Sequence, residues 1–217
     1  MLYGLIFANG DLNMGPAVQA ALDVPAERIV IAVDGGLRIA LQCGLRPALV
    51  IGDMDSADPA MLAEAAQHGA EIARFPANKD ETDLELALMA AAQRRCDPIR
   101  VIGAVGDRID QTLGNIYLLA LPLLHGRDVQ IVSHAQTTWL TYPGAHVVHG
   151  QAGDTLSLVP LAGSVIGITT SGLAYPLRHE TLAFGPARGI SNVFTDGQAR
   201  VTFESGLLLM THTMGRA

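Results

Sequence analysis

Polar residues suited to metal and phosphate chemistry recur directly after β-branched segments of the sequence. The groups are Asp34 with Gly35 and Gly36, Asp53 with Asp55, Lys79 with Asp80 and Asp83, and Gly103 with Gly106, Arg108 and Asp110. The segments before them end at Val33, Ile51, Phe75 and Ile102. In an open parallel sheet the carboxyl ends of all strands lie along one edge, where such folds bind ligands. We therefore expect these loops to meet at one edge of a sheet.

Carboxylates that converge in one place repel each other unless a cation offsets their charge. Asp53 and Asp55 lie two positions apart in Gly-Asp-Met-Asp-Ser and offer hard oxygen ligands, which suit Mg²⁺ bridged to substrate phosphates. The alternative is a turn followed by a helix N-cap before Pro59. For this motif alone the alternative is the better interpretation. Together with the other polar loops, the motif favours a metal site.

Lys79 is the only lysine of the chain, and arginine supplies the rest of the 14 basic residues. It opens the run Lys-Asp-Glu-Thr-Asp before an expected helix. Thr82 and Glu85 match a capping box, so part of this run has a purely structural interpretation. A compact ammonium next to aspartates is also suited to contact phosphate as a point charge.

The run from Gly103 to Asp110 has the composition of a junction between a strand, a loop and a helix. Glycines allow close approach of phosphate or ribose to the backbone, and a helix N-terminus favours anions. Arg108 has the geometry to bind phosphate through two hydrogen bonds. The sequence contains no GxxxxGK[ST] loop, so this is not a Walker A site.

Other catalytic chemistries find little support. The sequence has no HExxH and no GxSxG motif. The seven histidines are scattered, and His146 and His149 should face opposite sides of a strand, so we expect structural or surface roles for them. Trp139 is expected in a core.

The first part of the chain alternates strand-like and helix-like segments. Expected strands are 5–8, 28–33, 48–51, 71–75 and 99–102, and expected helices are 16–22, 37–43, 59–68, 84–95 and 112–124. This alternation predicts a mostly parallel sheet flanked by helices. After about His125 short strand-like segments such as 155–159, 166–169 and 200–203 are separated by turn residues, which predicts an antiparallel β-sandwich. We expect an α/β domain over residues 1–134 and an all-β domain over residues 135–217.

Composition narrows the class of protein. Of the 217 residues 49% are hydrophobic and 16% are charged, which is typical of a folded globular chain. The net charge of −7 argues against binding to nucleic acid, and no window is apolar enough for a membrane span. The segment 2–8 is expected to be a first strand and not a signal peptide. Cys43 and Cys96 are unpaired in the pattern, which predicts a reducing, cytoplasmic location.

The order and spacing of these motifs resemble the thiamine pyrophosphokinases. The resemblance runs nearly end to end. It covers Asp34-Gly35-Gly36, Gly52 to Ser56, Lys79 to Glu85, Gly103 to Asp110, Asn115, Gly153 to Pro160, Thr169 to Leu177 and Gly189 to Asn192. Each motif is weak by itself, but their joint order is highly specific.

The resemblance implies a nucleotide domain followed by a β-sandwich, in a homodimer whose active site lies between subunits. It implies transfer of the diphosphate of ATP to the hydroxyethyl group of thiamine, which gives thiamine diphosphate and AMP. In this family reaction the thiamine hydroxyl attacks the β-phosphorus. The chain would thus bind ATP, thiamine and Mg²⁺, with no nucleic acid or membrane partner.

Residue by residue, the resemblance implies three groups of roles. Asp53, Asp55, Asp80 and Asp83 would organise Mg²⁺ and the phosphates. Independently of the resemblance, we expect Lys79 and Arg108 to offset the charge of the phosphates, and Asp80 or Asp83 to accept the proton. Nucleotide would contact Asp34, Gly35, Gly36, Gly103, Gly106, Arg108, Asp110 and Asn115. Thiamine would contact Tyr175, Ser191 and Asn192, with Tyr175 offering an aromatic face to a partly cationic ring.

The chain departs from the family pattern at Asp107, where a glycine is frequent, and at Gln111, where many bacterial members have histidine. Tyr175 replaces the tryptophan of some members. The alternatives are a pyrophosphokinase or kinase for another heterocyclic alcohol, a non-catalytic thiamine or nucleotide sensor, and a purely structural sandwich protein. The full set of carboxylates argues against the last two.

Overall fold

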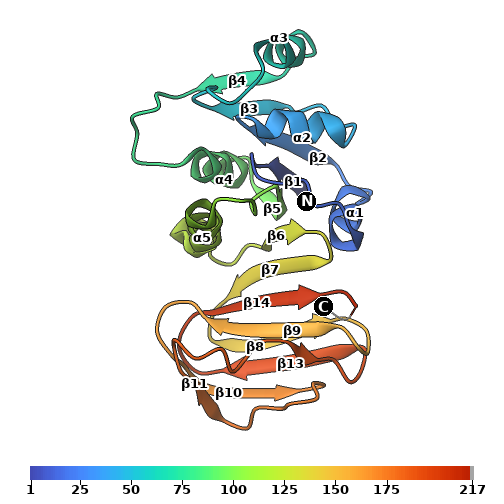
Figure 1. The fold of residues 1–217 in the computed structure, drawn as a ribbon, viewed down its shortest axis with the longest axis vertical. Coiled ribbons are helices and arrows are strands. Elements are labelled where there is room, and N and C mark those ends of the chain that lie inside the picture. The colour runs from blue at the N-terminus through green and yellow to red at the C-terminus, as the bar shows by residue number, and fades with distance from the viewer. Residues whose placement is uncertain (216–217) are drawn as a thin grey trace. The chain divides into compact units, whose positions relative to one another are not determined.

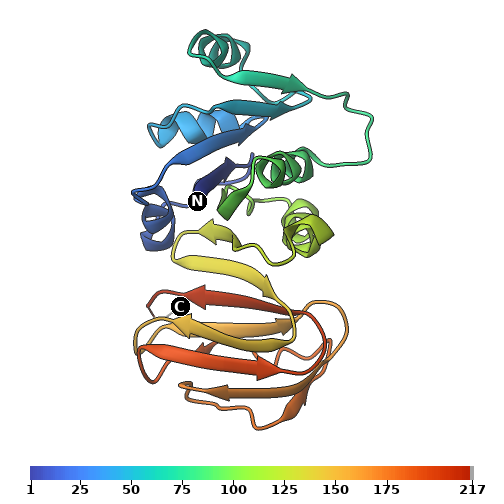
Figure 2. The ribbon, with the colours of Figure 1, turned by 180° about the vertical axis from the view of Figure 1, so that it is seen from behind.

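The computed structural model describes residues 1–215 and divides into two compact units, an N-terminal unit of residues 1–134 and a C-terminal unit that begins at Ala135. Figure 1 labels the elements of both units, and Figure 2 shows them from behind. No helix within residues 1–215 is long and apolar enough to cross a membrane.

The N-terminal unit is built on a parallel sheet with the strand order β6-β5-β1-β2-β3-β4. Its strands are β1 (Leu2–Phe7), β2 (Arg28–Val33), β3 (Leu49–Gly52), β4 (Glu71–Arg74), β5 (Cys96–Ile102) and β6 (Val129–Ser133). Its helices are α1 (Pro16–Leu22), α2 (Gly36–Gln42), α3 (Pro59–Gln67), α4 (Asp83–Gln93) and α5 (Ile109–Tyr117), followed by the 3₁₀ turns η1 (Leu118–Ala120) and η2 (Pro122–Leu124). All carboxyl ends of these strands therefore lie along one edge of the sheet.

The helices pack on the parallel sheet through buried apolar clusters. Tyr3, Leu5 and Phe7 of β1 form one buried cluster with residues of α1 and α2. Helix α3 joins α2 in a neighbouring cluster around Val50 of β3. Helix α4 packs on β1, β2, β3 and β5, and its face toward the sheet is rich in buried alanine and leucine. The small alanine side chains let α4 lie close to the sheet, which positions the loop before it.

Local sequence explains where the helices start. Asp58 caps α3 through Oδ1, which accepts hydrogen bonds from the N–H groups of Ala60 and Met61, and Pro59 occupies the first turn. Thr82 caps α4 by accepting from the N–H of Glu85. The cap before Pro59 is therefore Asp58 itself, and neither Asp53 nor Asp55 is needed for it.

The single helix expected over residues 112–124 was wrong. Helix α5 begins earlier, at Ile109, and ends at Tyr117, and two 3₁₀ turns follow it. Pro122 has no N–H for a helical hydrogen bond, and it disfavours helical backbone at the residue before it. Leu121 accordingly has ψ 129°, which breaks the helix.

The C-terminal unit consists of two antiparallel sheets with the strand orders β12-β9-β14-β7 and β11-β10-β13-β8. Its strands are β7 (Gln136–Thr141), β8 (Gly144–His149), β9 (Thr155–Pro160), β10 (Val165–Ser171), β11 (Glu180–Leu182), β12 (Asn192–Val193), β13 (Gln198–Phe203) and β14 (Leu208–Thr213). The predicted fold class, a helix-flanked parallel sheet plus an antiparallel sandwich, is confirmed.

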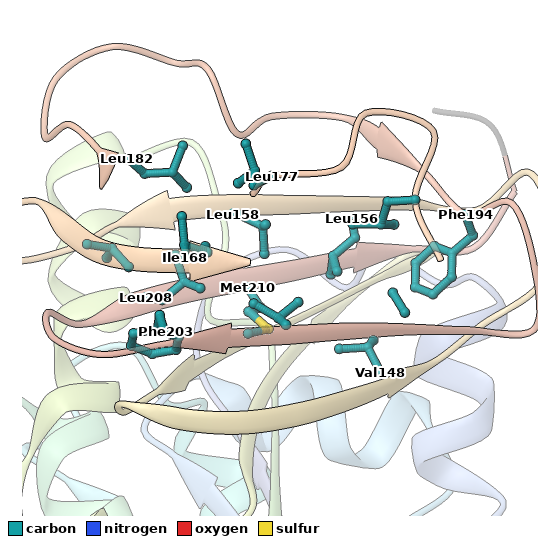
Figure 3. Packing of buried hydrophobic residues seen from close by; sticks show 14 residues of the cluster. Val148, Leu156, Leu158, Ile168, Leu177, Leu182, Phe194, Phe203, Leu208 and Met210 are labelled. Atoms are coloured by element: carbon teal, nitrogen blue, oxygen red, sulfur yellow. The ribbon is translucent and has the colours of Figure 1, made fainter. Parts of the chain in front are cut away.

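One apolar core lies between the two sheets of the C-terminal unit. Figure 3 shows Leu156, Leu158 and Met210 of the first sheet against Ile168 and Phe203 of the second. Trp139 of β7, expected in a core, is partly buried and packs against this cluster. Along β13 buried residues alternate with more exposed ones, as expected for a strand of a sandwich.

Candidate functional site

Asp34 lies in the tight turn between β2 and α2. Its backbone adopts a left-handed conformation with φ 47°, and its side chain is only 6% exposed. The N–H of Ser56, from the loop after β3, donates to both carboxylate oxygens over 3.2 and 3.3 Å. Burial raises the pKa of Asp34, hydrogen bonds from Ser56 oppose the rise, and the nearby charge of Asp55 adds to it. A strained, buried carboxylate with a disfavoured charge is typical of a functional position.

Three carboxylates, two from loops and one from the first residue of α4, converge at this edge. Asp34, Asp53 and Asp83 each place an oxygen within 4.8 Å of the others. Among residues 1–215, Oδ1 of Asp83 is buried and accepts no hydrogen bond. Gly52 makes this convergence possible, because a Cβ there would lie 3.2 Å from the Asp34 Cβ and from the Asp83 Cγ. We call these three residues the carboxylate cluster.

Lys79 contacts the carboxylate cluster from the loop between β4 and α4. Its Nζ lies 2.9 Å from Oδ1 of Asp83, and the two side chains are 11% and 23% exposed. The same ammonium donates a hydrogen bond to the backbone oxygen of Pro76 over 3.1 Å. The Lys79–Asp83 pair is thus a close ion pair at the edge of the carboxylate cluster.

The other two predicted metal ligands lie outside the carboxylate cluster. Asp55 is exposed and accepts a hydrogen bond from its neighbour, the Ser56 hydroxyl, over 2.8 Å. Its backbone N–H donates to Oδ1 of Asp53 over 3.1 Å, which fixes the orientation of the Asp53 side chain. Asp80 is exposed in the same loop as Lys79. The structure therefore brings Asp34, which the sequence indicated for nucleotide, to the carboxylates indicated for metal.

The glycines of the site edge are required by the packing of the protein itself. A Cβ at Gly36 would lie 2.0 Å from the backbone oxygen of Phe7, and one at Gly103 would lie 2.5 Å from that of Ala8. At Gly35 it would lie 2.2 Å from Oδ1 of Asn9. These glycines let the loops after β1, β2 and β5 approach one another. Their predicted contact with nucleotide stays a prediction.

Arg108 and Asp110 pair with each other at the start of α5. Their side chains are 66% and 68% exposed, and Nη2 of Arg108 lies 2.6 Å from Oδ2 of Asp110. Hydrogen bonding to Arg108 lowers the pKa of Asp110. Asn115 donates from Nδ2 to the backbone oxygen of Ala104 over 2.8 Å, and so anchors the Gly103–Gly106 loop to α5. Arg108 and Asp110 are both exposed, and Asp110 orients the Arg108 guanidinium through two hydrogen bonds.

Sequence reasoning missed the loop after β1, which reaches the same edge. The N–H of Gly10 donates to the oxygen of Gly103, and that of Asp11 donates to the oxygen of Val105. Asn9 lies directly over Gly35, as the close approach described above shows. The run Ala-Asn-Gly-Asp after the first strand was the available signal, since polar residues and a glycine followed a strand there as in the other loops.

The predicted thiamine residues lie together in the C-terminal unit. The Asn192 side chain accepts from the N–H of Tyr175 over 3.0 Å and donates to its backbone oxygen over 2.7 Å. This pair of bonds presents the Tyr175 side chain, which is 72% exposed. Ser191 has φ 57°, and its N–H donates to the Ser157 hydroxyl. Asn192 is buried, so it acts on Tyr175 and does not itself face solvent.

The segment from Thr169 to His179 forms an open hollow beside these residues. Its lining includes Thr170, Gly172, Pro176 and Leu177. The Thr170 hydroxyl accepts from the N–H of Leu177 over 2.8 Å, which holds the loop that carries Tyr175. The lining combines the apolar side chains of Leu173, Pro176 and Leu177 with the hydroxyl-bearing residues Thr169, Thr170 and Ser171.

A second buried aspartate, in the C-terminal unit, was not singled out from the sequence. Asp154 accepts hydrogen bonds from the N–H groups of Gln151 and Gly215 and from Nε2 of His212, at 2.8 to 2.9 Å. Burial alone favours its neutral form, but these hydrogen bonds outweigh burial and lower the pKa of Asp154. The His212 ring packs on Phe194. Every oxygen of this carboxylate is used by the protein, which indicates a structural role.

Two family models match this chain, one in each unit. The profile described as "Thiamin pyrophosphokinase, catalytic domain" matches residues 24–132, which include the carboxylate cluster. The profile described as "Thiamin pyrophosphokinase, vitamin B1 binding domain" matches residues 145–208, which include Tyr175 and Asn192.

Whole proteins match over nearly the full chain. The thiamine pyrophosphokinase of Bacillus subtilis strain 168 is 27% identical over 206 residues, which cover 94% of this chain and 95% of that protein. The crystal structure of a thiamine pyrophosphokinase from Bacillus subtilis has a TM-score of 0.86 at 25% identity and covers 99% of each chain. A family member from Enterococcus faecalis has a TM-score of 0.85 at 25% identity, over 99% of this chain and 100% of that one. The chain belongs to the thiamine pyrophosphokinase family.

Proposed function

We propose that this enzyme transfers the terminal diphosphate of ATP to the hydroxyethyl group of thiamine, with thiamine diphosphate and AMP as products. The observation that carries the proposal is the carboxylate cluster within the segment that matches the family's catalytic domain. A diphosphate acceptor site is supported separately by the match of residues 145–208 to the vitamin B1 binding domain.

Mg²⁺ fits the carboxylate cluster. Three carboxylates without enough cationic partners, one of them with a buried oxygen that accepts no hydrogen bond within residues 1–215, form a donor set of hard oxygens. Asp34, Asp53 and Asp83 would hold the ion directly. Asp55 and Asp80, which lie outside the cluster, would bind its water ligands or a second ion. When bound, the ion offsets charge on the phosphates and orients them.

The transfer itself requires mainly position and charge neutralisation. The hydroxyl oxygen of thiamine forms a bond to the β-phosphorus while the bond from that phosphorus to the oxygen of the α-phosphate breaks. AMP keeps that oxygen and leaves, and Asp80 or Asp83 accepts the proton of the hydroxyl. Lys79 and Arg108 offset the negative charge that develops on the phosphates.

The remaining predicted residues bind the two substrates. The backbone of Gly35, Gly36, Gly103 and Gly106 lines the edge along which ATP would lie, and Asp110 with Asn115 holds Arg108 and its loop in place. Tyr175 offers its exposed ring to the thiamine heterocycle. Ser191 and Asn192 shape that position through the hydrogen bonds described above.

We also propose a homodimer with the active site between subunits. Helix α5 supports association, because its apolar residues at a spacing of four, Ile109, Leu113 and Tyr117, are 82%, 48% and 49% exposed. Such a stripe normally packs against another surface. A dimer by light scattering that Leu113→Asp converts to monomer would support this part. An unchanged monomer in both proteins would exclude it.

A cytoplasmic location forms the last part of the proposal. Cys43 and Cys96 are both free thiols, and burial raises the pKa of each, so neither is poised for oxidation. Fractionation of the cells that produce the protein tests this location.

Product analysis tests the function. Purified protein is incubated with thiamine and Mg-ATP, and nucleotide and thiamine products are separated and quantified together. We expect thiamine diphosphate and AMP to appear in equal amounts. ADP with thiamine monophosphate would make the protein a simple kinase, and turnover only with another heterocyclic alcohol would replace the acceptor. Binding of both ligands without any product would indicate a sensor.

A further inference from the structure

We propose that Lys79 couples cation binding to nucleotide binding. Its ammonium pairs with the Asp83 carboxylate when nucleotide is absent, and it moves to pair with the phosphates when nucleotide binds. The inference rests on the proposed function, because it assumes that the carboxylate cluster takes a divalent cation and that phosphates bind beside it. It adds to that function two points: Lys79 has two successive partners, Asp83 and the phosphates, and it weakens binding of the cation in the absence of nucleotide.

The contacts of Lys79 show an ammonium held at the carboxylate cluster. Nζ lies 2.9 Å from Oδ1 of Asp83, and 3.1 Å from the backbone oxygen of Pro76. The side chain is 11% exposed, which is unusual for lysine outside a buried ion pair. The ammonium would exchange this ion pair, together with its hydrogen bond to Pro76, for contacts with phosphate oxygens.

The Lys79 ammonium lies close enough to the carboxylate cluster to lower its affinity for a free cation. Asp83 shares the carboxylate cluster with Asp34 and Asp53, whose oxygens lie within 4.8 Å of one another. A divalent ion bound there would lie close to Nζ, and like charges at such a distance repel each other. Lys79 therefore weakens binding of the free ion. Phosphates reverse the sign of the effect, since they attract both the ion and the ammonium.

The loop that carries Lys79 is suited to this exchange. The connection between β4 and α4 runs from residue 75 to residue 82, and most of its side chains are exposed. Figure 1 shows this connection as an extended loop beside the start of α4. Asp83 by contrast is the first residue of α4 and is fixed by the Thr82 cap. Lys79 can thus move while its partner stays in place.

Lys79→Met tests the coupling, because it removes the charge and keeps an unbranched side chain. Arg46→Met is the matched control, since it removes an exposed cation before β3, at the opposite edge of the sheet. Mn²⁺ binding without nucleotide is measured by electron paramagnetic resonance. Binding of an ATP analogue with a methylene group between the α- and β-phosphorus is measured by calorimetry at saturating Mn²⁺. Circular dichroism confirms that each variant is folded.

We expect Lys79→Met to bind free Mn²⁺ about tenfold more tightly than the parent, from the removal of one nearby positive charge. It should bind the nucleotide analogue about tenfold more weakly, from the loss of one charged phosphate contact. Arg46→Met should change neither affinity by more than about twofold. Unchanged or weaker Mn²⁺ binding in Lys79→Met overturns the proposal, whatever its turnover.

The single lysine of the chain gives a second test on the unmodified protein. Protein that contains ¹⁵N-lysine has one lysine side-chain ammonium signal, which belongs to Lys79. Addition of Mg²⁺ and the ATP analogue should move this signal and abolish its contact with Asp83. A signal that keeps its position when both ligands are bound contradicts the exchange.

The two proposals can fail separately. If the parent forms thiamine diphosphate and AMP, but Lys79→Met leaves Mn²⁺ affinity unchanged, the coupling is wrong and the proposed function stands. If Lys79→Met shifts both affinities as expected, but the parent forms no thiamine diphosphate, the coupling stands and the acceptor assignment is wrong.

Discussion

Two aspartates in the two units of this molecule are buried to the same degree and used in opposite ways. Asp34 in the N-terminal unit and Asp154 in the C-terminal unit are each 6% exposed. Asp154 receives hydrogen bonds from Gln151, His212 and Gly215, whereas Asp34 receives them from the Ser56 backbone N–H and lies beside other carboxylates. The pKa of Asp154 is lowered below its ordinary value, and that of Asp34 is raised above it.

The difference separates a carboxylate that stabilises the fold from one that serves a ligand. The protein satisfies Asp154 with its own donors, so its charge favours the folded state. It buries the charge of Asp34 beside other carboxylates and holds the residue in a left-handed backbone conformation, both of which disfavour the folded state. A bound cation would reverse this for Asp34 and would do nothing for Asp154.

The largest expected effect concerns the carboxylate cluster. Asp53→Asn should reduce turnover by about a thousandfold or more, because an amide is a poor ligand for Mg²⁺. The protein should remain folded by circular dichroism. Asp58→Asn is the matched control in the same loop, since asparagine also caps helices and Asp58 lies outside the cluster. Near-normal turnover of Asp53→Asn would remove Asp53 from the metal site.

Asp154→Ala should lower the free energy of unfolding, because Asp154 has a structural role and no role in turnover. Removal of one partner of a buried, hydrogen-bonded charge costs about 3 kcal/mol of unfolding free energy. The single tryptophan, Trp139, packs on the core of the C-terminal unit and reports its unfolding in urea. Asp196→Ala, at an exposed turn, should cost less than about 1 kcal/mol. Equal losses in the two variants would show that Asp154 is not specially stabilising.

Asp34→Asn should increase the stability of protein that has been freed of metal by a chelator, in contrast to the loss expected for Asp154→Ala. Removing a disfavoured buried charge should raise Tm by a few degrees, while turnover is lost. All helices within residues 1–215 belong to the N-terminal unit, so helical circular dichroism follows its melting. Addition of Mg²⁺ should raise the Tm of the parent and leave that of Asp34→Asn unchanged. A lower Tm for the metal-free variant would show that Asp34 stabilises the fold as Asp154 does.

The smallest expected effect is in the dependence of stability on pH. The folded pKa of Asp154 is lowered, so its contribution is present above the unfolded value of about 3.9 and is lost as the pH falls through the folded value. The pKa of Asp34 is raised, so protonation relieves its disfavoured charge at a higher pH than the one at which the contribution of Asp154 is lost, and it does so in the N-terminal unit. Urea midpoints of the C-terminal unit between pH 3 and pH 7 should fall less steeply in Asp154→Asn than in the parent. Identical slopes would contradict the assignment.

Much of the fold was predictable, because its signals are local. The β-branched run 28–33 and the proline-initiated helix 16–22 have their expected bounds. The order of the polar loops at one sheet edge also followed from the alternation of strands and helices. The end of α5 was missed because Pro122 acts on a pattern of leucines that otherwise continues the helical spacing.

The membership of the carboxylate cluster was only partly predictable. Asp53 and Asp83 were indicated as metal ligands, but Asp34 was assigned to nucleotide. The direction of its side chain depends on the left-handed turn and on the Ser56 N–H from another loop. The role of Asp154 could not be predicted for the same reason, since two of its three partners, His212 and Gly215, are distant from it in the sequence. Contacts between distant segments leave no periodic signal in a sequence.

The central claim is that Asp34, Asp53 and Asp83 together hold a divalent cation. Crystals grown with Mn²⁺ and the methylene analogue of ATP would locate the ion directly through its anomalous scattering. We predict a peak within coordination distance of an oxygen from each of these three carboxylates. A peak bound by Asp55 or Asp80 without Asp34, or no peak at this edge of the sheet, would contradict the account.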